Sequence, residues 1–214
     1  MDDGCIKATA KDVRRQTILE MAREIFLEDG YAAASMSAIA ARLGGSKGTL
    51  YNYFASKEEL FKAVIQDQCD RKMTLMFEGM TAGDGDVAKG LHTLGTRYAT
   101  IVLGEDVINL SRILVAEVLR FPELGKTMYE AGPLQGAQRL GAYMEKQMQA
   151  GRLRKADPRR AAEQFCELCL AGLYRQRLWN VIPARPEAKA IRDNVEAAIE
   201  TFMAAFGAPG AEAV

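Results

Sequence analysis

Residues 35–54 read SMSAIAARLGGSKGTLYNYF, and they predict two short helices joined by a tight turn. Ser35 stands where a helix N-cap is expected. The apolar residues that follow it recur at helical spacing: Met36, Ile39, Ala40 and Leu43. The pair Gly44-Gly45 permits a sharp turn, and Ser46 is placed to cap a second helix over Lys47 to about Phe54.

The flanking segments are also predicted to be helical. From Asp12 to Asp29 one apolar stripe runs through Ile18, Met21, Ala22, Ile25 and Phe26, and Gly30 ends this helix. Ser56 with Glu59 three residues later is a capping-box pattern, and it opens a helix that continues to about Met80. Two short helices behind a longer packing helix form a helix-turn-helix, whose second helix reads the DNA major groove.

The remaining sequence keeps a helical pattern, interrupted by glycine and proline at Gly104, Pro122, Gly132-Pro133, Gly151 with Pro158, and Pro183 to Pro186. These interruptions predict about six further helices, of which the last two span about 158–181 and 184–206. No segment alternates between apolar and polar residues as a strand does. We therefore expect an all-α fold, with a three-helix DNA-binding domain followed by a larger helical ligand-binding and dimerisation domain.

The expected domain limits are an arm over 1–11, the helix-turn-helix domain over 12–56, the helical domain over 57–207 and a tail over 208–214, with both ends disordered. The first ten residues lack a basic stretch followed by an apolar segment, and no apolar run is long enough to cross a bilayer. We therefore expect a cytoplasmic protein without membrane contact. Its four cysteines are too dispersed for a disulfide framework.

The charge of the 214-residue chain gives no global argument for nucleic acid, because 28 basic residues balance 28 acidic ones. From Ser35 to Lys57, however, the charged residues are Arg42, Lys47 and Lys57, and all three are positive. Lys57 also stands at the start of a helix, where a DNA phosphate can meet both its ammonium and free N–H groups. A helix-turn-helix shape also recurs as ordinary packing, so these features decide little one by one.

Together, the first helix ending at Gly30-Tyr31, the 46–54 run SKGTLYNYF and the following KEEL at 57–60 resemble the TetR family of transcriptional regulators. The resemblance covers about Arg14 to Ile65, with Gly45 standing where the family usually has an apolar residue. It implies a repressor that grips a palindromic operator as a homodimer and is released by a small, largely apolar effector. The residues implied to touch double-stranded DNA are Ser35, Ser37, Ser46, Lys47, Gly48, Thr49, Tyr51, Asn52, Tyr53 and Lys57.

An effector pocket is expected among flexible and aromatic side chains of the C-terminal half, because methionine adapts to irregular apolar guests. The candidates are Met73, Met76, Phe77, Met80, Tyr98, Phe121, Met128, Tyr129, Tyr143 and Met144. Ordinary core packing is the alternative for each one of them. Arg112 is a candidate anchor for an effector carboxylate, and pairing with Glu117 is the alternative.

The last two helices resemble the family's dimer interface, a four-helix bundle across a two-fold axis. The candidate interface residues are Phe165, Cys169, Gly172, Leu173, Val195, Ile199, Phe202 and Phe206.

Two other functions remain open. One is a redox-sensing regulator that uses the Cys166-x-x-Cys169 pair, although core packing of these cysteines is the simpler reading. The other is an architectural DNA-binding protein without a ligand. A lone histidine, His92, no metal-ligand set and no phosphate-binding glycine loop argue against an enzyme, and we expect no metal and no cofactor.

Overall fold

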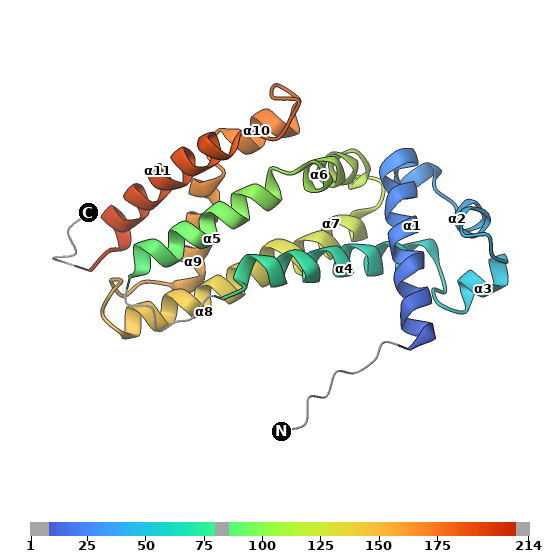
Figure 1. The fold of residues 1–214 in the computed structure, drawn as a ribbon, viewed down its shortest axis with the longest axis horizontal. Helices are drawn as coiled ribbons and strands as arrows, with labels where there is room; N and C mark the ends of the chain where they lie inside the picture. The colour runs from blue at the N-terminus through green and yellow to red at the C-terminus, as the bar shows by residue number, and fades with distance from the viewer. Residues whose placement is uncertain (1–8, 80–85, 209–214) are drawn as a thin grey trace. The chain divides into compact units, whose positions relative to one another are not determined.

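The computed structural model describes residues 9–79 and 86–208, which form eleven α-helices and one π-helical turn (Figure 1). The predicted all-α class is confirmed, since no strand occurs within these two ranges. The chain divides into two compact units. Unit 1 holds the described residues up to Gln68 together with 113–127, and unit 2 holds 69–112 together with 128–208.

In unit 1, α1 spans Ala10–Ala33 and begins with a capping box, in which Thr9 Oγ1 accepts from the Asp12 N–H and the Asp12 carboxylate accepts from the Thr9 N–H. Its buried face holds the predicted stripe of apolar residues, among them Ile18, Ala22 and Ile25. Gly30 has a φ of 78°, which glycine adopts without steric cost, so the regular helix ends there as predicted. A further turn reaches Ala33 beyond this kink.

The two short helices are α2, Met36–Arg42, and α3, Lys47–Tyr51, each capped by the expected serine. Helix α3 is shorter than predicted, because the N–H groups of Tyr53 and Phe54 turn back to one shared acceptor, the Leu50 carbonyl. Helix α4 spans Lys57–Phe77. The Glu59 N–H donates to Ser56 Oγ at 3.1 Å, as in a capping box, but the Glu59 carboxylate accepts from the Ala55 N–H instead of from Ser56.

An aromatic cluster holds unit 1 together. The ring centroids of Phe26 and Phe61 lie 5.1 Å apart, and those of Tyr31 and Phe61 lie 4.9 Å apart. Phe121, from the 113–127 segment, packs edge-on against Tyr31 at 5.0 Å. Unit 1 is therefore larger than the expected 12–56 domain, because the start of α4 and the 113–127 segment complete its core. The assignment of functional domains stays a prediction.

In unit 2, α8 packs on α9, and α11 packs on both α5 and α9 (Figure 1). Their apolar faces form one buried cluster that includes Leu91, Met144, Phe165, Val195 and Phe202. The bounds of the helices after α4 are α5 Val87–Val102, α6 Glu105–Glu117, α7 Pro122–Tyr129, α8 Gln135–Gln149, α9 Pro158–Cys169, α10 Leu173–Leu178 and α11 Ala188–Phe206. Helices α4, α6 and α7 each contain residues of both units.

Two predicted helix limits are wrong. No break occurs at Gly132-Pro133, because Pro133 lies in a π-helical turn, Glu130–Leu134, that joins α7 to α8. The wider turn accommodates a residue that has no N–H to donate. Conversely, the single helix predicted over 158–181 is split into α9 and α10 at Gly172, whose φ of 76° is not helical.

The side chain of Arg177, on α10, is fully buried and binds residues at the start of α6 and in the loops next to α6 and α10. Its Nη2 lies 2.8 Å from the carboxylate of Glu105 at the start of α6. Its other nitrogens donate to the Leu103 carbonyl at 3.2 Å and to the carbonyls of Ile182 and Pro183 at 3.0 and 2.5 Å. A buried guanidinium with this many acceptors is satisfied.

Candidate nucleic-acid interface

Helix α3 packs against unit 1 through buried side chains, and a serine caps its N-terminus. The Leu50 side chain is 2% exposed, and Phe54 is equally buried, as predicted for the inward face. At the start of α3, Ser46 Oγ accepts from the Thr49 N–H at 3.1 Å and lies 2.9 Å from Thr49 Oγ1. These contacts fix the rotation of α3, so its other side chains must face outward.

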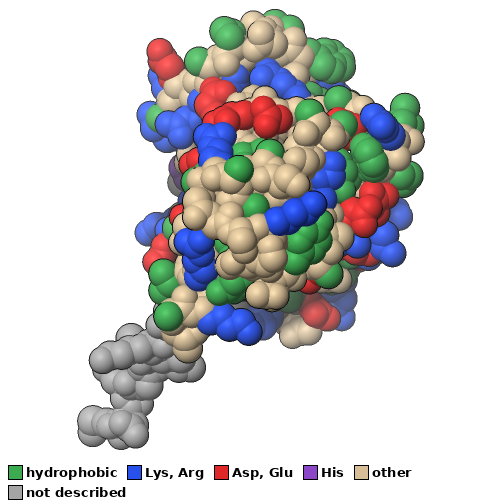
Figure 2. All heavy atoms as spheres, turned by 90° about the vertical axis from the view of Figure 1, so that its right-hand side faces the viewer, with side chains coloured by type: hydrophobic (Ala, Val, Ile, Leu, Met, Phe, Trp, Pro, Cys, Tyr) green, Lys and Arg blue, Asp and Glu red, His purple; other side chains and the backbone are tan. Residues whose placement is uncertain are grey.

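The outward face carries the residues predicted to meet DNA. Ser35, Ser37, Ser46, Lys47, Gly48, Thr49, Tyr51 and Asn52 are exposed, and Tyr53 is half-buried. Tyr51 is 43% exposed, with the Lys47 ammonium 5.8 Å from its ring centroid. No described residue forms a hydrogen bond with the side chains of Tyr51, Asn52 or Tyr53. Figure 2 shows a face whose middle is largely tan, the colour of the backbone and of side chains that are neither hydrophobic nor charged, with basic, acidic and hydrophobic side chains around it. The surface therefore offers unused hydroxyl and amide groups, which suit phosphates and base edges.

Lys57 has internal partners that the sequence did not predict. Its Nζ donates to the carbonyls of Tyr31, Ala32 and Ala34 at 2.8, 3.3 and 3.0 Å, and it lies 4.4 Å from the centroid of the Tyr31 ring. An ammonium has three hydrogens, so its donors are used inside the protein. Burial lowers the pKa of Lys57, and the nearby Glu117 carboxylate opposes that shift. Lys57 thus caps the end of α1, and a phosphate would have to compete with three carbonyls for its N–H groups.

Arg42 is also engaged within unit 1. Its two terminal nitrogens both donate to the Glu28 carboxylate, and Nη2 lies 3.9 Å from Glu24. This ion pair lowers the pKa of Glu28. Of the three cations between residues 35 and 57, only Lys47 is exposed and outside an internal salt bridge or cap, so the local positive charge is weaker than the sequence suggests.

A cation outside that stretch was missed. Arg14, on α1, places Nη2 3.4 Å from where a Cβ on Gly45 would stand, beside the turn that leads into α3. Helical spacing in α1 gave no signal for this approach, because spacing does not say which neighbour a helix face meets.

The predicted effector residues are distributed over both units, and their role stays a prediction. Met73, Met76, Tyr143 and Met144 are buried in unit 2, which fits both core packing and an enclosed apolar site. Phe77, Tyr98 and Met128 are half-buried. Two candidates are placed elsewhere, since Phe121 packs on Tyr31 within unit 1 and Tyr129 is 51% exposed. Met80 lies outside the described residues.

Arg112 is bound by acceptors other than Glu117, and its role toward an effector stays a prediction. Its guanidinium donates to the carbonyls of Arg177 and Leu178 at 2.7 and 3.1 Å, and to the side-chain oxygens of Asn109 and Asn180 at 3.1 and 3.2 Å. It therefore caps the end of α10. Its nearest acceptors are carbonyls and amides, and neither an effector carboxylate nor Glu117 is needed to satisfy it.

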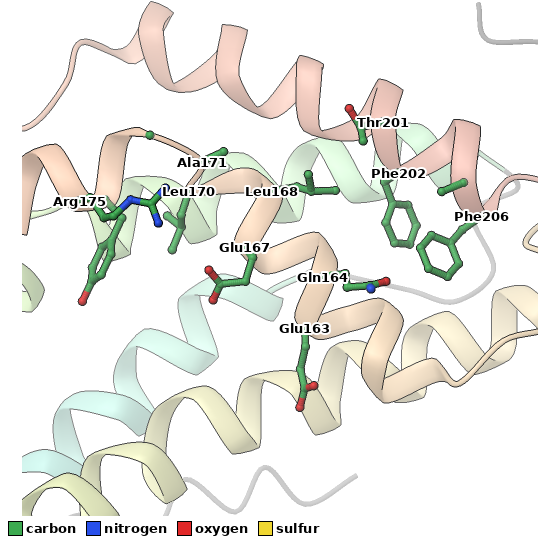
Figure 3. A pocket seen from close by; sticks show the side chains of 13 residues that line it. Glu163, Gln164, Glu167, Leu168, Leu170, Ala171, Arg175, Thr201, Phe202 and Phe206 are labelled. Atoms are coloured by element: carbon green, nitrogen blue, oxygen red, sulfur yellow. The ribbon is translucent and has the colours of Figure 1, made fainter.

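An open groove of about 650 Å³ lies along α9, α10 and α11 (Figure 3). The rings of Phe202 and Phe206 stack at one end, with centroids 4.7 Å apart, and Arg175 stands at the other. Of the predicted interface residues, Gly172, Phe202 and Phe206 line the groove, and Leu173 and Ile199 are half-buried. Phe165, Cys169 and Val195 are 0% exposed and form the subunit's own core, and Phe202 joins that core while bordering the groove.

The two cysteines of the C-x-x-C pattern are poorly placed for redox chemistry. Burial raises the pKa of Cys166 to about 12, and burial also raises the pKa of Cys169. The reactive species is the thiolate, which both environments disfavour at neutral pH. Across the described ranges, no group of His, Cys, Asp and Glu side chains is arranged to hold a metal, and none of the helices there has the length and apolar character of a membrane span.

Two family models match the chain. Residues 18–64 match bacterial regulatory proteins of the tetR family, and residues 89–208 match the C-terminal domain of AefR-like transcriptional repressors. The second match covers more than half of the chain.

Solved structures are similar over almost the full length. The flavonoid-responsive regulator FrrA is 31% identical, with a TM-score of 0.81, covering 93% of this chain and 99% of that protein. A TetR-family transcriptional regulator of Mesorhizobium loti is 25% identical with a TM-score of 0.79, at 93% and 99% coverage.

Curated relatives match over shorter stretches. The transcriptional regulator UidR of Escherichia coli K12 is 35% identical over 105 residues, which are 49% of this chain and 50% of UidR. The transcriptional activator FasR of Mycolicibacterium smegmatis is 48% identical over 60 residues, which are 28% of this chain and 27% of FasR. The chain thus spans half or less of the length of these relatives.

Proposed function

Since this chain belongs to the TetR family of transcriptional regulators, we propose that it is a homodimeric repressor that binds a palindromic operator and leaves it when a small, largely apolar effector binds unit 2. The observation that carries this proposal is the outer face of α3, where Thr49, Tyr51 and Asn52 are exposed while Leu50 is buried. The match to AefR-like transcriptional repressors supports repression. The name of FasR, an activator, shows that relatives of the N-terminal segment also work in the opposite direction.

The groove along α9, α10 and α11 supports the dimer. Two residues of α11 that line it, Thr201 and Ala205, are small and exposed, so a second helix can approach closely. The groove also holds both Glu167 and Arg175. A two-fold axis places the same surface on both subunits, so an acid of one copy can face a base of the other. A two-fold dimer presents two copies of α3, and the operator should then be palindromic.

The name of FrrA supports an aromatic effector, because that protein is described as flavonoid-responsive. The side chains of Met73, Met76 and Tyr143, which are buried in unit 2, provide the adaptable apolar surface that such a guest needs. Binding lowers DNA affinity only if the effector prefers the released conformation. Helix α4 contains residues of both units, so a tilt of α4 is the proposed link between effector and DNA.

The test starts with selection of bound sequences from a random duplex library, which yields the operator. Operator binding is then measured with and without a panel of flavonoids. Met76→Trp and Phe77→Trp should change release by the effector more than they change basal operator affinity. Leu75→Trp serves as the matched control, because Leu75 lies on the same helix and is 58% exposed. Equal loss of basal affinity and release would contradict the α4 link, and release by no effector would favour a ligand-independent architectural protein.

A further inference from the structure

Arg14 lies against the turn between α2 and α3. It is half-buried and shares a small hollow with Leu43, Gly45, Ser46 and Thr49, which belong to the turn and to the start of α3. Its Nη2 is 3.4 Å from the position that a Cβ on Gly45 would take. A cation of α1 is thus held beside the polar side chains of the candidate DNA surface.

The absence of a side chain at Gly45 explains this approach. The neighbouring Gly44 has a φ of 63° and supplies the left-handed residue of the turn, whereas the φ of Gly45 lies outside the range that favours glycine. The backbone therefore does not require glycine at 45. A small side chain there would touch the guanidinium, and a branched one would displace it.

Arg14 differs from the other basic residues near α3 in having no partner among the described residues. Arg42 is paired with Glu28, Lys57 caps α1, and the Arg15 guanidinium lies 5.3 Å from the Phe54 ring centroid. No acceptor for the Arg14 guanidinium occurs among the residues that the structure describes. Its planar group of N–H donors lies beside the turn with no acceptor in the described part of the chain, and it matches the oxygens of a phosphate.

We infer that Arg14, on α1, is a phosphate-binding residue of the DNA interface, and that the absence of a side chain at Gly45 leaves room for its guanidinium. The inference rests on the proposed DNA binding and adds a contact that the helix-turn-helix pattern does not contain. In a dimer, each copy of Arg14 would neutralise one phosphate, so two contacts per complex depend on it.

The experiment measures binding of the full-length protein to a random-sequence 30-base-pair duplex at several salt concentrations. Each neutralised phosphate adds about 0.9 to the slope of log affinity against log salt. Arg14→Ala should therefore lower the slope by about 1.8 per dimer, which corresponds to a loss of up to about 60-fold at 0.1 M salt. Lys146→Ala, which removes an exposed charge from α8, is the matched control and should leave the slope unchanged.

Gly45→Val tests the placement without removing a charge. It should weaken binding in the wild-type background and have little further effect in Arg14→Ala, because both changes remove the same contact. Thermal unfolding of each variant identifies a loss of binding that comes from unfolding. Because Arg14→Lys keeps the charge and fits the same hollow, it should retain part of the slope even if Arg14→Ala is unstable.

The outcomes are distinct. A wild-type protein that binds no duplex overturns the DNA-binding proposal and this inference with it. Binding by the wild type with an unchanged slope in Arg14→Ala overturns the inference alone. Additive losses in Arg14→Ala and Gly45→Val overturn the role of Gly45.

Discussion

Replacing Lys57 with methionine separates a structural role from a DNA-binding one. Methionine keeps much of the apolar stem but removes the ammonium that caps α1. The carbonyls of Tyr31 and Ala34 are part-buried and lose their charged donor, at about 1 kcal/mol each, while water can reach the exposed Ala32 carbonyl. The lost contact with the Tyr31 ring adds roughly 0.5–1 kcal/mol. We therefore expect Lys57→Met to lower the free energy of unfolding by about 2–3 kcal/mol.

For a chain of this size, that loss corresponds to a fall of roughly 5–10 °C in the unfolding temperature. Urea unfolding followed by circular dichroism measures it, with Lys62→Met, an exposed change on the same helix, as the matched control. DNA binding is measured well below the unfolding temperature, where the salt slope of Lys57→Met should equal that of the wild type. An unchanged unfolding midpoint together with a slope lowered by about 1 per subunit would show that Lys57 is a phosphate clamp after all.

Four further predictions concern unit 2 and the thiols. Arg177→Met should lower the free energy of unfolding by roughly 3–5 kcal/mol, because Glu105 and three carbonyls lose their shared donor, and urea titration against the exposed Arg185→Met checks it. Gly172→Ala, at a φ of 76°, should cost about 1 kcal/mol in the same assay, whereas Gly136→Ala, inside α8, should not show that backbone penalty. The pKa values of Cys69 and Cys166 are about 11 and 12, so their thiols in the native protein should resist a disulfide reagent at pH 8. The experiment uses a Cys5→Ser background. Rapid labelling without urea would favour the redox-sensing alternative. Thiols of the unfolded chain lose their protons near pH 9, whereas those of the folded protein keep them to higher pH. The free energy of unfolding should therefore fall between about pH 9 and 12, and urea midpoints at pH 8 and 10.5 measure this fall.

Local signals were sufficient for most of the helices. Ser35 and Ser46 cap α2 and α3 as predicted, because a cap is a contact between residues three apart in sequence. Gly30 ends the regular part of α1 for the same local reason. The two wrong helix limits arose because the effect of proline and glycine on a helix depends on their surroundings. Pro133 is accommodated in a π-helical turn, and Gly172 breaks a helix without a neighbouring proline.

The sequence by itself determined the all-α class, the capped short helices and the outward face of α3, because periodicity and capping depend on near neighbours along the chain. Only the tertiary structure decided what the long cationic side chains contact. Lys57 meets the end of α1, Arg112 the end of α10, and Arg14 the turn at Gly45. It also decided that Phe165 and Val195 belong to the subunit's own core. A helical stripe specifies that a face is buried, but the partner of that face and the acceptor of a flexible cation are set by segments far away in sequence.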